Sequence, residues 1–138
     1  MNTPVRDDVA EFFDQFTAAG DTADSVEAGK RFHPILLTLD PMSASQVTRE
    51  QVVASLPRRK QFFARLGVTG MTLDSLAESP IDDRHTLVRA SWRLDRTATS
   101  ALAEGTVFTS TYLLRKVDAD WQIVVYLNHQ DLRALAST

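Results

Sequence analysis

The stretch that decides the fold is residues 112–123, which read Tyr112-Leu113-Leu114-Arg115-Lys116-Val117-Asp118-Ala119-Asp120-Trp121-Gln122-Ile123. Asp118-Ala119-Asp120 is typical of a tight turn, and the segments on both sides of it are rich in β-branched and aromatic residues. The pattern predicts a hairpin with strands over residues 106–116 and 121–128. The chain is therefore expected to close in an antiparallel sheet.

Two more strands are predicted before this hairpin. Residues 85–95 alternate between apolar and polar side chains, as a half-buried strand does. The apolar face of this strand consists of Val88, Ala90, Trp92 and Leu94. Residues 68–78 form a weaker candidate, because their apolar positions do not alternate cleanly and so indicate a bulge. The second half of the chain thus reads as a meander of strands.

The first half has a helical period instead. Its first helix carries apolar residues at the helical spacing of three and four. These residues are Val5, Val9, Phe12, Phe13 and Phe16. A second helix is predicted from Asp21 or Thr22, and the same spacing continues through Phe32, Ile35, Leu36 and Leu39. Pro34 should kink or break that helix near His33, because proline lacks the backbone donor that a helix needs.

A third helix is predicted after a polar loop. Residues 48–51, Thr-Arg-Glu-Gln, have the form of a capping box that opens a helix at Thr48. Pro57 should interrupt this helix and begin a separate one, which Gly67 ends. Helices followed by antiparallel strands predict the α+β class, with helices packed on one face of a curved, mainly antiparallel sheet.

Composition narrows the classes of function. The chain has 138 residues, expected to form one domain over residues 1–138, with 15 Lys and Arg against 18 Asp and Glu and a net charge of −3. This balance argues against nucleic-acid or anionic-membrane binding. The absence of cysteine excludes disulfides and thiolate chemistry. The longest apolar run has five residues, from Ile123 to Leu127, and the N-terminus lacks the pattern of a secretory signal. A soluble, cytoplasmic protein is expected.

The order of these features resembles one superfamily. The aromatic helix around Phe12-Phe13-Asp14-Gln15-Phe16, the Gly20-Asp21 turn, and the Leu56-Pro57-Arg58-Arg59 segment come first. The closing hairpin then runs into Leu127-Asn128-His129-Gln130-Asp131. Together they resemble the nuclear transport factor 2-like, or SnoaL-like, α+β cone proteins. The resemblance implies N-terminal helices packed on the concave face of a strongly curved, mainly antiparallel sheet, with a conical cavity between sheet and helices. It also implies that dimerisation often occurs through the convex face.

Members of that superfamily include isomerases, polyketide cyclases, dehydratases, hydrolases and ligand-binding domains, so the fold leaves the function open. Strand parity predicts a largely aromatic and apolar cavity, although one bulge would reverse the parity and the inward face of residues 106–116 stays open. The expected cavity residues are Phe16, Phe32, Phe62, Trp92, Phe108, Ser110, Tyr112, Trp121, Ile123, Val125 and Leu127. Val124 and Tyr126, on the other face of the last strand, are expected to form a homodimer interface.

Two histidines are the candidate catalytic residues. His129 ends the last strand on its inferred inner face, and His33 precedes Pro34, so either could act as a general base. The alternative for His129 is a strand-end residue at the rim, and for His33 a residue at the surface end of a helix. Asp40 and Asp95 are the carboxylates nearest the expected cavity rim and could act as acid or base. Asp40 before Pro41 is more simply a turn residue, and Asp95 lies on the polar face of its strand.

Metal and cofactor sites find no support in the sequence, since no paired histidines, phosphate-binding loop or dinucleotide fingerprint is present. No metal and no cofactor are therefore expected. Arg58, Arg59, Lys60 and Arg65 form a basic helical patch. A solvated helix face is the simpler interpretation. In the alternative, Arg58 or Arg59 points at an anionic ligand or at a carboxylate such as Asp131.

Three hypotheses of function follow. The first is a homodimeric protein that binds a small, largely apolar molecule in the cavity. The second is a cofactor-independent isomerase, cyclase or dehydratase with a cavity histidine as general base. The third is a structural dimerisation module whose cone is filled by side chains. Nucleic acid and membrane are not expected as partners in any of them.

Overall fold

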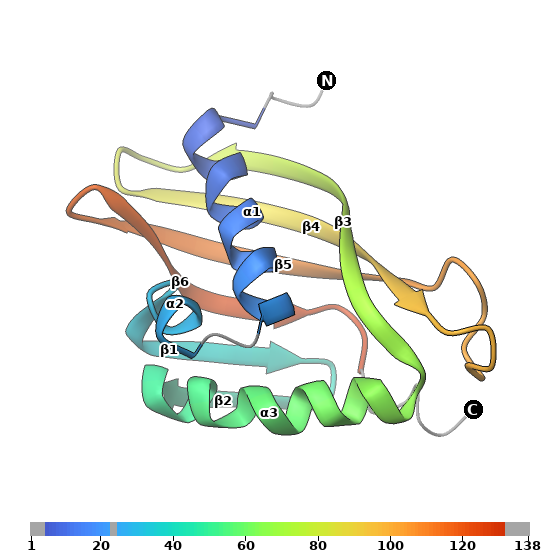
Figure 1. Ribbon diagram of the computed structural model, residues 1–138. Coiled ribbons are helices and arrows are strands. Elements are labelled where there is room, and N and C mark those ends of the chain that lie inside the picture. Colours follow the sequence, from blue (N-terminus) through green and yellow to red (C-terminus); the bar gives the residue numbers. More distant parts are fainter. Residues whose placement is uncertain (1–4, 23–24, 132–138) are drawn as a thin grey trace.

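Helices lie on one side of a curved sheet in the computed structural model, which describes residues 5–22 and 25–131 (Figure 1). The helices are α1 (Asp7–Thr22), α2 (Ser25–Gly29) and α3 (Arg49–Arg65). The strands are β1 (Phe32–Asp40), β2 (Ser43–Thr48), β3 (Val68–Pro80), β4 (His85–Arg96), β5 (Val107–Val117) and β6 (Asp120–Asn128).

The strands form one sheet in the order β2-β1-β6-β5-β4-β3. Every neighbouring pair is antiparallel except β1 and β6, which are parallel. The predicted α+β class, with helices packed on a curved and mainly antiparallel sheet, is confirmed. The parallel pair brings an early segment of the chain next to its last strand, a contact of long range that local periodicity does not encode.

The predicted continuation of a helix through residues 32–39 is wrong, because these residues belong to strand β1. Pro34 is compatible with neither a regular helix nor a regular ladder, and the pairing with β6 is irregular between Phe32 and Leu37. Beyond this irregularity the strand pairs regularly with β6 on one side and with β2 on the other. The residues expected to form a polar loop thus build the edge strand β2.

Helix α3 begins where the capping box predicts. The hydroxyl of Thr48 accepts a hydrogen bond from the backbone N–H of Gln51 (3.1 Å), and the Gln51 side chain accepts one from the Thr48 backbone N–H (2.9 Å). Pro57 lies inside this continuous helix, so the predicted separate helix is wrong. Gly67 follows the helix with a φ of +78°, which glycine adopts without strain. None of the described helices is long and apolar enough to cross a membrane.

The core lies between α1 and the inner face of the sheet. The burial of β4 and β5 alternates along most of each strand, and the inward side of β5 consists of Phe108, Ser110, Tyr112 and Leu114. Helix α1 covers these strands with Val9, Phe12 and Phe13, all of them buried. The ring of Phe13 meets that of Tyr112 edge to face, with centroids 5.1 Å apart.

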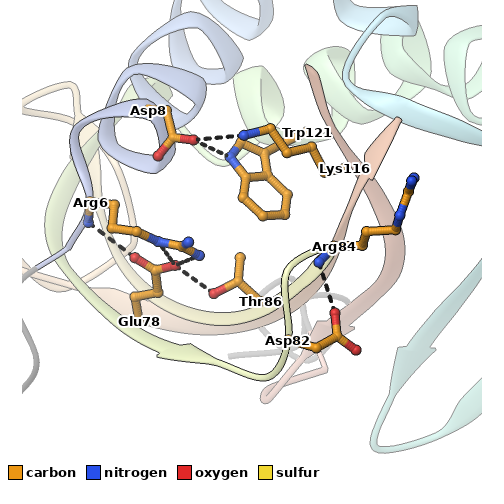
Figure 2. A network of polar contacts seen from close by, with 8 residues as sticks. All are labelled: Arg6, Asp8, Glu78, Asp82, Arg84, Thr86, Lys116 and Trp121. Atoms are coloured by element: carbon orange, nitrogen blue, oxygen red, sulfur yellow. Dashed lines mark hydrogen bonds and ion pairs between the residues drawn. The ribbon is translucent and has the colours of Figure 1, made fainter. Parts of the chain in front are cut away.

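A polar network fastens the start of α1 to the sheet (Figure 2). The carboxylate of Glu78 is almost fully buried and accepts hydrogen bonds from the Arg6 backbone (3.0 Å), the Arg6 side chain (2.9 Å) and the Thr86 hydroxyl. Next to it, Asp8 accepts a hydrogen bond from the indole N–H of Trp121 (2.9 Å). This network fixes the position of the helix over the cone.

Candidate functional site

A cavity of about 860 Å³ opens between α3, the inner face of the sheet and the end of α1. Its size is within the range of small-molecule sites, roughly 300–1,000 Å³. Helix α3 contributes most of one wall, and every strand contributes at least one residue. The apolar and aromatic part of the lining includes Phe16, Phe32, Leu39, Val52, Leu56, Phe63, Met71, Trp92, Phe108 and Tyr126.

A bulge in β6 decides which of its residues face this cavity. Leu114 pairs with Ile123 and Leu113 pairs with Val125, so Val124 is an extra residue in the ladder. The bulge reverses the parity of everything after it. Tyr126 consequently turns inward and lines the cavity together with Asn128, and Val125 takes the outward side.

A series of hydrogen bonds and ring contacts joins the core to a cation in the cavity wall. The indole N–H of Trp92 donates to the hydroxyl of Tyr112 (3.2 Å), whose ring centroid lies 4.8 Å from that of Tyr126. The Tyr126 hydroxyl accepts a hydrogen bond from Nη1 of Arg59 (3.2 Å). The Arg59 guanidinium also lies over the rings of Phe63 (5.7 Å) and Tyr126 (5.8 Å).

Two residues in this series of contacts, Arg59 and Tyr112, have shifted pKa values. An electrostatic interaction with Tyr126 raises the pKa of Arg59 above its ordinary value, and burial opposes this effect without reversing it. Burial raises the pKa of Tyr112 well above that of free tyrosine. At neutral pH the cavity wall therefore holds the charged Arg59 guanidinium, and the Tyr112 phenol buried behind the wall is neutral.

Two carboxylates also line the cavity, and both have partners of their own. Asp95 accepts a hydrogen bond from the Thr72 hydroxyl (2.8 Å) and lies 3.9 Å from Nε of Arg93. Asp40 accepts one from the backbone N–H of Met42 (2.8 Å). Within residues 5–22 and 25–131, neither carboxylate forms an ion pair with Arg59. The same residues contain no cluster of three histidine or acidic side chains able to hold a metal ion.

The comparisons with known proteins agree with this fold. Residues 5–131 match the model of a family described as NTF2-like protein (DUF6841). The chain belongs to this NTF2-like family. No curated protein matches it.

Solved structures similar to this NTF2-like chain have low sequence identity and therefore show the fold alone. An NTF2-like protein with a cystatin-like fold from Novosphingobium aromaticivorans is 14% identical, with a TM-score of 0.72 over 94% of this chain and 87% of that one. A protein of unknown function with a cystatin-like fold from Nostoc punctiforme is 10% identical, with a TM-score of 0.70 over 96% of both chains. An NTF2-like protein of unknown function from Shewanella oneidensis is 14% identical, with a TM-score of 0.67 over 90% of this chain and 98% of that one.

Four of the predicted cavity residues of this NTF2-like chain line the cavity, namely Phe16, Phe32, Trp92 and Phe108. Five others belong to the core instead. Ser110, Tyr112, Trp121 and Ile123 are buried behind or beside the cavity, and Phe62 packs partly buried against the core. Trp121 does not line the cavity, and its indole N–H donates to Asp8 at the start of α1.

The remaining predictions for β6 are corrected by its bulge. Val125 and Leu127 were expected to line the cavity and lie on the outward side. Tyr126 was expected at a dimer face and instead is buried and lines the cavity, and Val124 is the bulge residue itself.

The candidate catalytic histidines lie outside the cavity of this NTF2-like chain. His129 is exposed, and its Nε2 lies 2.6 Å from the Thr111 hydroxyl on the outward side. His33 holds its Nδ1 3.0 Å from the carbonyl oxygen of Ile35. His85 is half-buried between Asp82 and Arg115. None of the three histidines can reach a molecule in the cavity as a general base.

Sequence reasoning left Arg59 undecided between solvent and ligand. The sequence could have predicted that Arg59 faces inward. Its helix face, at the helical spacing, consists of Val52, Leu56, Arg59 and Phe63. Because the apolar face of a helix packs toward the interior, a basic residue on that face is directed inward as well. Asn128 had no comparable signal, since its inward orientation depends on the β6 bulge.

Proposed function

We propose that this chain binds a small, mainly apolar molecule in the cavity between α3 and the sheet. The observation that carries the proposal is the cavity itself, about 860 Å³ with aromatic and aliphatic side chains over much of its wall. Apolar walls with a few convergent polar groups are the usual make-up of small-molecule sites. A cavity of this volume argues against a cone filled by side chains. The enzyme hypothesis lacks its general base, because no histidine lines the wall.

Binding of the neutral dye Nile red tests this proposal. We expect saturable, one-to-one binding with a rise in dye fluorescence. Leu56→Trp fills part of the cavity and should weaken binding about tenfold, or ~1.4 kcal/mol. Leu87→Trp makes the same change at a partly exposed position outside the cavity and should leave the affinity unchanged. Unsaturable binding, or equal effects of the two variants, would contradict the proposal.

A homodimer through the outer face of the sheet is also proposed. Strand pairing aligns Leu37, Val125, Leu113 and Leu87 in one row across β1, β6, β5 and β4. Leu37 is 43% exposed and Leu87 is 41% exposed, and all described helices lie on the other side of the sheet (Figure 1). A second copy that presents the same row would cover it, as a two-fold symmetric interface does.

A further inference from the structure

Arg59 is a cation in the cavity wall, and no carboxylate among the described residues forms an ion pair with it. The guanidinium has five N–H donors, and the described residues accept a hydrogen bond from one of its nitrogens, through the Tyr126 hydroxyl. Its other contacts are the faces of the Phe63 and Tyr126 rings, which attract a cation but accept no conventional hydrogen bond. Arg59 is partly buried, and removing a charged group even partly from water is unfavourable unless a partner compensates it.

The other charged groups around the cavity do not supply that partner. Asp95 is held by Thr72 and Arg93, and Asp40 by the backbone of Met42. Within the described ranges, no acidic oxygen lies within 4 Å of the Arg59 guanidinium, since it takes part in none of the ion pairs found there. Lys60, the second basic residue of the lining, is exposed. The described residues therefore leave the Arg59 guanidinium available to an anion in the cavity.

The surroundings of Arg59 also indicate the chemical class of such an anion. One guanidinium beside one tyrosine hydroxyl matches a group of single charge with two oxygens, because a guanidinium binds a carboxylate through two parallel hydrogen bonds. The aromatic and aliphatic wall around it matches an apolar body. We propose that the ligand is a monoanionic carboxylic acid with an apolar body, whose carboxylate binds Arg59 while the body occupies the rest of the cavity. This inference rests on the proposed function and names its ligand class.

A matched pair of probes tests it, 1-naphthylacetate and its neutral amide, 1-naphthylacetamide. Isothermal titration calorimetry of the wild-type chain should show the acid bound about ten- to a hundredfold more tightly, the range expected of a hydrogen bond to a charged group. Arg59→Gln should abolish this preference and leave amide binding unchanged. Arg58→Gln removes the neighbouring, exposed arginine and should leave the preference intact.

Arg59→Lys keeps the charge without the planar pair of donors, so its preference for the acid should be smaller than that of the wild type yet present. If Arg59→Gln does not fold by circular dichroism, the acid-to-amide ratios of the wild type and of Arg59→Lys decide the question. Equal binding of acid and amide by the wild type, an unchanged preference in Arg59→Gln, or no acid binding while Nile red binds would each overturn the inference alone. Absence of binding by the acid, the amide and Nile red together would instead refute the proposed function, and the inference with it.

Discussion

At the scale of single residues, one charged side chain anchors the start of α1 to the sheet and another provides a positive charge in the cavity wall. Glu78 and Arg59 are the two examples, and their environments differ. Glu78 is fully engaged by Arg6 and Thr86, whereas the described residues satisfy Arg59 only in part. A charge that is fully paired inside the protein contributes to stability, and one that is partly paired is available to a ligand.

Glu78→Gln should therefore lower the free energy of unfolding by about 1–3 kcal/mol, because hydrogen bonds to a charged group are worth roughly that much. Urea unfolding followed by tryptophan fluorescence measures the change. Glu104→Gln is the matched control, since Glu104 is exposed and lies 3.8 Å from Arg96. It should change stability by less than about 0.5 kcal/mol. A similar loss in both variants would contradict the role assigned to Glu78.

The same network predicts how stability depends on pH. Burial raises the pKa of Glu78, but hydrogen bonds from Arg6 and Thr86 outweigh burial and leave that pKa below its ordinary value. For Asp8, burial is likewise outweighed by the Trp121 hydrogen bond and by Lys116 and Arg6, and its pKa is also lowered. Both carboxylates thus stabilise the fold above about pH 4.5, where they would be ionised in the unfolded chain as well.

This stabilisation should be lost as the pH falls through the lowered pKa values of the folded protein. The urea midpoint of the wild type should fall steeply between pH 5 and pH 3, and that of Glu78→Gln should fall less, because one of the two carboxylates is gone. Equal slopes for the two proteins over this window would show that Glu78 is not responsible. Stability that rises on acidification would contradict the sign of the effect.

At the scale of elements, prediction from sequence succeeded where local chemistry decides the outcome. The capping box at Thr48, the turn around Asp118 and the alternation of β4 all depend on residues near in sequence. It failed at β1, where pairing with the distant strand β6 overrides a helical spacing, and along β6, where one bulge residue reverses the faces. The cavity prediction failed at the same points, since Val125 and Tyr126 exchange sides there.

The capping box supports a prediction at this scale. Thr48→Ala removes the acceptor for the Gln51 backbone N–H and should destabilise the protein by about 1 kcal/mol. Thr48→Ser keeps a hydroxyl at the same position and should restore most of that loss. Thermal unfolding of the three proteins, followed by far-ultraviolet circular dichroism, makes the comparison. Equal stability of Thr48→Ala and the wild type would show that tertiary packing alone holds the start of α3.

At the scale of the whole molecule, the architecture follows from the order of its parts. The helical pattern of the first half and the strand pattern of the second half were enough to predict the α+β class, although β1 and β2 were not predicted as strands. All described helices lie over the inner face (Figure 1). There α1 packs on the core and α3 forms one wall of the cavity. The outer face therefore keeps an apolar row that one copy of the described chain leaves partly exposed.

The proposed homodimer makes the last prediction. A charge within the row of Leu37, Val125, Leu113 and Leu87 would be buried without a partner in a dimer, but solvated in a monomer. The double variant Leu37→Lys with Leu87→Lys should therefore sediment as a monomer under conditions where the wild type sediments as a dimer. Arg89→Lys, on the same face of β4 but outside the row, is the control and should leave the dimer intact. Because both leucines lie outside the cavity lining, Nile red binding should survive in the double variant. A wild-type chain that sediments as a monomer at all concentrations, or a double variant that remains dimeric, would show that this face is not the interface.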